Sequence, residues 1–100
     1  MEKRYLKVRP VCKVTFRLPK QAVSAAKNVH VVGEFNGWDL TATPLKKQKN
    51  GDFAITVDLD KGREYLFRYL IDGMIWENDW EADKYAPTPW GDGDNSVVVV

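Results

Sequence analysis

Apolar and polar residues alternate along much of this chain, and the alternation predicts β-strands. In segments 12–18 and 53–59, apolar residues fill every second position, and mostly polar residues stand between them. Segment 65–71 carries aromatic and branched residues on one face and includes Arg68 on the other. A period of two is the repeat of a strand that buries one face. We therefore expect three strands here that pack against a common core.

Turn signals separate these strands and mark further ones. Asn36-Gly37, Asn50-Gly51 and Asp72-Gly73 are among the strongest short signals for a tight turn. Further strands are expected from Val29 to the turn at 36–37, at 45–49, at 74–77 and at 95–100. Segment 78–94, which is rich in proline and glycine, is predicted to be a loop. Segment 21–26 is predicted to be one helical turn or a small loop.

About seven short strands with regularly spaced turns indicate an all-β fold, a sandwich of two sheets. Residues 11–100 would form the sandwich, and residues 1–10 would be an N-terminal extension or an edge strand. The run 97–100 consists of valine alone. All-apolar strands are usually central and buried on both faces. The alternative here is an edge strand covered by a missing neighbour.

The composition excludes several classes of function. The chain has 100 residues, with 15 basic and 14 acidic side chains and a net charge of +1. Such balance argues against nucleic acid or an anionic membrane as the main partner. The single cysteine, Cys12, alternates with polar residues, so we expect a small buried hydrophobe. The N-terminus has no apolar signal-peptide core, and a cytoplasmic location is expected.

Two tryptophans follow turn signals directly. Trp38 comes after Asn36-Gly37, and Trp76 comes shortly after Asp72-Gly73. Turns lie at the surface, so these flat apolar rings are candidates for stacking on a sugar ring. The alternative is that both rings cap the ends of the sandwich core, because tryptophan is usually largely buried. The pattern alone favours neither interpretation.

Two polar residues are candidates for the same ligand. Arg68 faces away from the expected core, and a turn at Asp72-Gly73 would fold Trp76 back towards it. A guanidinium donates to ring hydroxyls, and an amide such as that of Asn95 both donates and accepts. Trp38, Arg68 and Trp76 would then form one patch.

Three motifs resemble those of a known family. Residues 33–38, Gly-Glu-Phe-Asn-Gly-Trp, are similar to the G-x-F-N-x-W signature of glycogen-binding modules. These modules, carbohydrate-binding module family forty-eight, occur in β subunits of AMP-activated protein kinase and at the N-termini of branching enzymes and isoamylases. Residues 67–73 are similar to the family's Y-K-F-x-V-D-G strand and turn, and residues 94–98 are similar to its closing strand. The motifs occur in the family's order and span roughly residues 11–100.

The resemblance implies an immunoglobulin-like, early-set β-sandwich that binds α-1,4-linked glucans such as glycogen, starch or maltooligosaccharides. It implies stacking roles for Trp38 and Trp76, and hydroxyl contacts for Arg68 and Asn95. Trp90 would replace a leucine that the kinase-type module carries in its binding loop. The sequence also departs from the pattern. One extra residue precedes Trp76, and the loop threonine of the kinase-type module has no clear match.

Other functions are weighed against this one. The first alternative is a docking or regulatory module for a glucan-active enzyme or a kinase-like partner, which burial of Trp38 and Trp76 would favour. An enzyme ranks third, because no catalytic constellation, metal cluster or cofactor site is visible around His30 or elsewhere. Alternating acids surround Trp80 in segment 77–83, and we expect them to be a solvated, flexible loop rather than a glycosidase pair. Segment 92–95 is expected to be a turn rather than a calcium loop.

Overall fold

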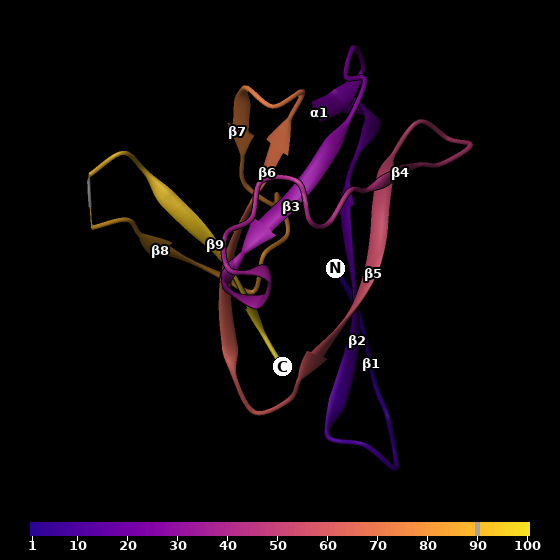
Figure 1. Ribbon diagram of the computed structural model, residues 1–100, viewed down its shortest axis with the longest axis vertical. Coiled ribbons are helices and arrows are strands. Elements are labelled where there is room, and N and C mark those ends of the chain that lie inside the picture. Colours follow the sequence, from indigo (N-terminus) through magenta and orange to yellow (C-terminus); the bar gives the residue numbers. More distant parts are fainter. Residues whose placement is uncertain (90) are drawn as a thin grey trace.

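The structure is a computed structural model that describes residues 1–89 and 91–100. It is built almost entirely of short strands arranged in two layers (Figure 1). The strands are β1 (Glu2–Tyr5), β2 (Val11–Leu18), β3 (Val29–Gly33), β4 (Lys46–Lys47), β5 (Phe53–Asp60), β6 (Glu64–Ile71), β7 (Ile75–Glu77), β8 (Lys84–Pro87) and β9 (Asp94–Val99). The helical elements are α1 (Lys20–Val23) and a 3-10 turn, η1 (Glu34–Asn36). No helix in the described part of the chain is long and apolar enough to cross a membrane.

The strands form two antiparallel sheets, which confirms the predicted β-sandwich. Sheet A has the order β1-β2-β5-β4, and β2 pairs with β5 along its whole length. Sheet B has the order β3-β6-β9-β8, with β7 also paired to β6. Residues 2–5 form the edge strand of sheet A. The Asn50-Gly51 turn joins β4 to β5, as the sequence predicted.

Strand β6 organises sheet B. One edge of β6 pairs with β3. The other edge is divided, because residues 64–67 pair with β9 and residues 69–71 pair with β7. Arg68 therefore lies at the junction between the two partner strands. This division brings the start of β9 and the β7 strand to the same part of the sheet.

The alternation predicted from the sequence produces the core between the sheets. Phe16, Phe67 and Tyr69 are fully buried. Phe16 meets Phe67 edge-on at 5.0 Å between ring centroids, and Phe67 meets Tyr69 at 5.7 Å. Burying each of these side chains contributes roughly 1.5–3 kcal/mol before entropy is counted. Cys12 is also fully buried in this core, as predicted.

Of two sequence expectations about the C-terminal part, one alternative is settled and one prediction is wrong. β9 lies between β6 and β8, so its valines occupy a central strand, as all-apolar strands usually do, and not the edge strand of the alternative. Segment 78–94 is not all loop, because β8 pairs with β9 within it. Pro87 ends β8, and proline is tolerated there because β8 is an edge strand with no partner required on its other side. The described residues thus contain nine strands instead of about seven.

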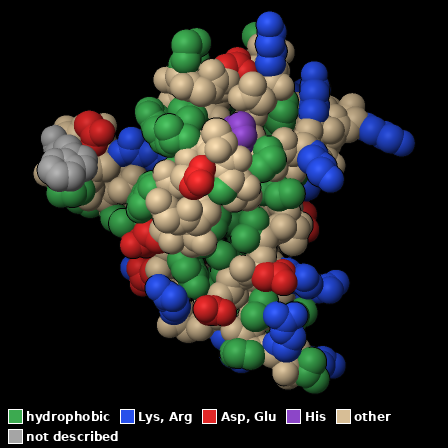
Figure 2. Space-filling model, in the orientation of Figure 1, with side chains coloured by type: hydrophobic (Ala, Val, Ile, Leu, Met, Phe, Trp, Pro, Cys, Tyr) green, Lys and Arg blue, Asp and Glu red, His purple; other side chains and the backbone are tan. Residues whose placement is uncertain are grey.

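Charged side chains are dispersed over the surface. In the face seen in Figure 2, most lysine and arginine side chains project along the right-hand side, including the region of β4, and acidic side chains are scattered over the face. Several pairs form salt bridges across strands, such as Lys13 with Asp58 at 2.8 Å between Nζ and Oδ1. Exposed pairs of this kind contribute little to stability.

Candidate functional site

Four of the five candidate site residues line one open groove on the outer face of sheet B. The groove has a volume of about 530 Å³. Its described lining residues are Trp38, Leu66, Arg68, Trp76, Thr88, Pro89, Asp92 and Asn95. The fifth candidate, Trp90, lies outside the described residues. The sequence predicted that Trp38, Arg68 and Trp76 would form one patch. In the structure, these three residues and Asn95 line the same groove.

Both groove tryptophans are exposed. Trp38 is 40% exposed and Trp76 is 45% exposed. Neither ring is part of the buried core, so the alternative in which both rings cap the core does not describe this structure. Each ring offers apolar surface to the groove.

The turn that carries Trp38 is held from inside by an asparagine. Asn36 Oδ1 accepts a hydrogen bond from the Gly33 amide at 3.1 Å, and Asn36 Nδ2 donates to the Val31 carbonyl at 3.0 Å. Gly37 (φ 67°) and Trp38 (φ 60°) both adopt left-handed backbone conformations. Such a conformation is strained for tryptophan, and the surrounding hydrogen bonds hold it in place. The turn therefore presents the indole at a defined position.

The first residues of this turn pack against β6 and form a hydrogen bond with it. A Cβ on Gly33 would lie 2.6 Å from the Leu66 carbonyl oxygen, so only glycine fits where β3 approaches β6. Glu34 Oε1 accepts a hydrogen bond from the Leu66 amide at 2.7 Å. Phe35 stacks on Phe16 with ring centroids 5.2 Å apart. These contacts, together with those of Asn36, explain the residue types at positions 33–36.

The β6–β7 hairpin positions Trp76. Asp72 (φ 52°) and Gly73 (φ 68°) form its turn, and both have the positive φ of a type I′ turn. Asp72 Oδ1 accepts hydrogen bonds from the backbone amides of Asn28 and Lys27, which lower the pKa of its carboxyl. Trp76 stands opposite Leu70, one pleat along from Arg68 on the same face.

Arg68 is held by two groove residues. Its Nε donates to Asn95 Oδ1 at 2.8 Å, and one terminal nitrogen lies 3.6 Å from Asp92 Oδ1. The Arg68 side chain is only 15% exposed. A guanidinium held in this way loses little further freedom when it binds, because its rotamer is already selected. The Asn95 amide is oriented by the same bond, with its oxygen towards Arg68.

Sequence reasoning did not identify Asp92 or Thr88 as groove residues. The Thr88 hydroxyl donates to Asp92 Oδ1. This hydrogen bond and the charge of Arg68 lower the pKa of the Asp92 carboxyl. The loop reverses because Gly91 and Gly93 have positive φ, and the Thr88 amide donates to the Gly93 carbonyl at 2.9 Å. The two glycines marked a turn in the sequence, but nothing in the pattern indicated that the loop reaches Arg68.

The acidic segment 77–83 is only in part the solvated loop that the sequence suggested, because Asp79 is buried while Glu81 is exposed. Asp79 is only 4% exposed, and its Oδ2 accepts a hydrogen bond from the buried Tyr69 hydroxyl at 2.7 Å. The Asp79 amide donates to Ser96 Oγ at 2.9 Å, and Tyr85 donates to the Asp79 carbonyl at 2.5 Å. Burial and the nearby carboxylate raise the pKa of Tyr69. Asp79 thus anchors the segment to the core, which alternation alone did not reveal.

The acidic, histidine and cysteine side chains that the structure describes do not form a second candidate site. Within residues 1–89 and 91–100, no three histidine, cysteine or acidic side chains come together in a way that would hold a metal ion. His30 lies on β3, opposite Leu70. The groove is therefore the site that unites the candidate residues.

Comparison with known proteins shows the family. Residues 21–100 match the family model described as the glycogen recognition site of AMP-activated protein kinase. The chain belongs to this family. It is also 36% identical over 61 residues to the 1,4-alpha-glucan branching enzyme GlgB of Butyrivibrio fibrisolvens. The alignment covers 61% of this chain and 10% of that enzyme, so the chain matches only a small part of its relative.

Proposed function

We propose that this chain is a non-catalytic module that binds α-1,4-linked glucans such as glycogen, starch or maltooligosaccharides in the groove on sheet B. The observation that carries the proposal is that Trp38, Trp76 and the restrained Arg68 line one groove. Membership of a glycogen-recognition family supports a glucan as the ligand.

The chemistry of the groove suits a sugar. The exposed indoles offer apolar faces to the C–H faces of glucose rings, each stacking contact contributing on the order of 1 kcal/mol by analogy with aromatic pairs. Arg68 and Asn95 carry N–H donors for ring hydroxyls, and Asp92 is an acceptor. Asp92 also balances the charge of Arg68. A groove with paired charges favours a neutral ligand over an anion.

The same geometry argues for a binding role without catalysis. A glycosidase needs two carboxyl groups on opposite sides of the scissile bond, one of which must be protonated. Among the described lining residues, the carboxylate is that of Asp92, and its lowered pKa keeps it ionised at neutral pH. Asp92 therefore lacks both a partner carboxyl and the proton of a general acid.

One observation favours a second candidate function, docking onto a glucan-active enzyme. Met74 is 77% exposed and Ile75 is 57% exposed, and both precede Trp76. Exposed apolar side chains of this kind fit a protein interface. Co-elution with a 1,4-alpha-glucan branching enzyme that lacks its own binding module would support docking, provided that Met74→Ser and Ile75→Ser together abolish it.

The test of glucan binding is calorimetric titration with maltoheptaose. The wild-type chain should bind, and Trp76→Ala should weaken binding while leaving the β-type circular dichroism spectrum unchanged. Tyr5→Ala is the matched control, because Tyr5 is 52% exposed on β1 and does not line the groove. Affinity should change little with added salt, because a neutral ligand releases no counterions. Absence of binding to maltoheptaose and to glycogen would refute the proposal.

A further inference from the structure

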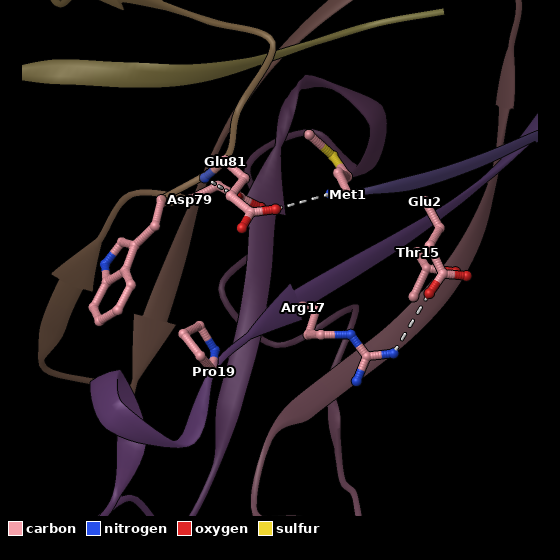
Figure 3. Close-up of a pocket in the computed structure, with 8 residues that line it drawn as sticks. Met1, Glu2, Thr15, Arg17, Pro19, Asp79 and Glu81 are labelled. Carbon is pink, nitrogen blue, oxygen red and sulfur yellow. Dashed lines mark hydrogen bonds and ion pairs between the residues drawn. The ribbon is translucent and has the colours of Figure 1, made fainter.

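A second pocket lies apart from the groove, where the start of β1 meets the end of β2 and the segment after β7 (Figure 3). Its volume is about 280 Å³. Its lining residues are Met1, Glu2, Thr15, Arg17, Pro19, Asp79, Trp80 and Glu81. None of them lines the groove. Thr15 and Arg17 project from the outer face of sheet A, whereas the groove lies on the outer face of sheet B.

Trp80 is exposed in this pocket, although hydrogen bonds fix the residues on either side of it in the chain. Trp80 is 54% exposed. On one side, Asp79 is buried and hydrogen-bonded to Tyr69 and Ser96. On the other side, the Glu81 amide donates to Asp79 Oδ1 at 2.8 Å, which closes a tight turn around Trp80. The backbone is thus anchored to the core, while the indole remains available to a ligand.

The polar walls of the pocket have capacity for hydrogen bonds. The Arg17 guanidinium lies 3.6 Å from Asp52 Oδ2 and 3.8 Å from Glu2 Oε1, which are ion-pair distances too long for hydrogen bonds. Figure 3 shows Arg17 directed towards Glu2, with Pro19 on the side of Arg17 away from Glu2. Glu81 Oε2 is 3.9 Å from the Met1 nitrogen. Donors and acceptors therefore stand beside an apolar surface formed by Trp80 and Pro19.

The charges around this pocket select against an anion. Three carboxylates, those of Glu2, Asp79 and Glu81, outnumber the guanidinium of Arg17 even when the Met1 amino group is added. A phosphate or an acidic peptide would meet net repulsion. A cation would have to compete with Arg17 for Glu2 and with the Met1 amino group for Glu81, and both Asp79 carboxylate oxygens already accept hydrogen bonds. A neutral ligand that has an apolar face and several hydroxyls fits both the apolar surface of the pocket and its hydrogen-bonding side chains, and it meets no charge repulsion.

We propose that this pocket is a second carbohydrate-binding site. It binds one or two neutral sugar rings, which stack on Trp80 and form hydrogen bonds through their hydroxyls with Arg17 and Glu81. The volume is close to the lower end of the range for ligand pockets, about 300 Å³, and so suits a short segment of a chain. The choice of an α-glucan as the occupant rests on the function proposed above. Because the two sites share no lining residue, one module would hold two segments of a branched polymer. Such bivalency raises the apparent affinity for the polymer without any new contact.

The indole N–H resonances of the tryptophans provide a direct test. Nitrogen-15-labelled protein is titrated with maltoheptaose, and each resonance is assigned by a single Trp→Phe substitution. We expect the Trp80 signal to shift in the wild type and also in the double variant Trp38→Ala/Trp76→Ala. A shift of the groove signals with a static Trp80 signal would overturn this inference and leave the proposed function intact. A shift of Trp80 alone would support the second site and refute the groove.

Binding to a polymer tests bivalency. Trp80→Ala should weaken binding to glycogen about tenfold, because simultaneous engagement of two segments is lost. It should leave the affinity of the groove for maltoheptaose unchanged. Trp80→Phe, which keeps an aromatic face, should restore most of the glycogen affinity, and Tyr5→Ala is the control for an exposed aromatic outside both sites. Unchanged glycogen affinity in a folded Trp80→Ala variant would overturn the inference.

Discussion

The Arg68 Nε group donates a hydrogen bond of 2.8 Å to Asn95 Oδ1, although the two residues are 27 positions apart. Arg68 lies on β6 and Asn95 on β9, just beyond the last register pair of these strands, Phe67 with Ser96. Both residues line the groove. The pairing of two strands thus selects the rotamer of the residue proposed to contact sugar hydroxyls.

This coupling predicts non-additive effects on binding. Asn95→Ala removes its own contact and also the restraint on Arg68, so it should weaken maltoheptaose binding by more than one hydrogen bond, about 1 kcal/mol, would account for. Arg68→Ala should then have a smaller effect in the Asn95→Ala background than in the wild type. A double-mutant cycle measured by calorimetry checks this. Additive losses would show that Arg68 is not positioned by Asn95.

The Trp38 side chain should contribute to binding and not to folding. Because it is exposed, Trp38→Ala should weaken glycogen binding about tenfold or less, the equivalent of a stacking contact of about 1 kcal/mol. Affinity electrophoresis in glycogen gels provides the measurement, and circular dichroism provides the folding control. An unfolded variant would contradict the prediction by making Trp38 a structural residue.

Gly33 should be required for folding. A Cβ there would lie 2.6 Å from the Leu66 carbonyl oxygen and 2.7 Å from Phe67 Cβ, and neither belongs to a flexible side-chain end. Gly33→Ala should therefore cost about 1–3 kcal/mol of unfolding free energy, as overpacking does. Gly37→Ala is a matched comparison, because its Cβ would contact nothing within 4 Å and only its φ of 67° opposes the change. Urea denaturation should show the larger loss for Gly33→Ala.

Asp72 should make stability depend on pH at the acidic end. Its folded-state pKa lies below the ordinary value of 3.8 because the Asn28 and Lys27 amides donate to the ionised form. A lowered pKa stabilises the folded state above the unfolded pKa, and the contribution is lost as pH falls through the folded pKa. Asp72→Ala should therefore lower the melting temperature at pH 7 more than at pH 3. Asp72→Asn retains an acceptor and tolerates the positive φ, so it should lower the melting temperature less than Asp72→Ala at pH 7. An equal loss at both pH values would contradict this account.

The chain should show no glycosidase or branching activity. Among the described residues that line its groove, Asp92 has no partner carboxyl, and Asp79 is engaged in the buried network of Tyr69 and Ser96. Incubation with maltoheptaose or amylopectin should release no reducing ends and create no branch points. Turnover that disappears on replacement of Glu77, Asp79, Glu81 or Asp83 would refute this prediction.

Much of the fold was predictable because its signals are local. Alternation identified the core faces of β2 and β6, and the Asn-Gly and Asp-Gly pairs identified the turns. The short motif at 33–38 also indicated that Trp38 would stand beyond a turn, and the structure shows it exposed. These features depend on residues a few positions apart, so a pattern along the chain contains them.

The sequence by itself therefore determined the β-sandwich, most of its strands and the turns that carry Trp38 and Trp76. Only the tertiary structure decided that β8 adds an edge to sheet B, that Asp79 is buried, and that Asp92 reaches Arg68. Each of these depends on partners that are distant along the chain: β8 needs the central β9, Asp79 needs Tyr69, and Asp92 needs the loop that Gly91 and Gly93 reverse. A polar residue is expected to be solvated when only the sequence is known, because burying it is favourable only if partners in the interior form its hydrogen bonds.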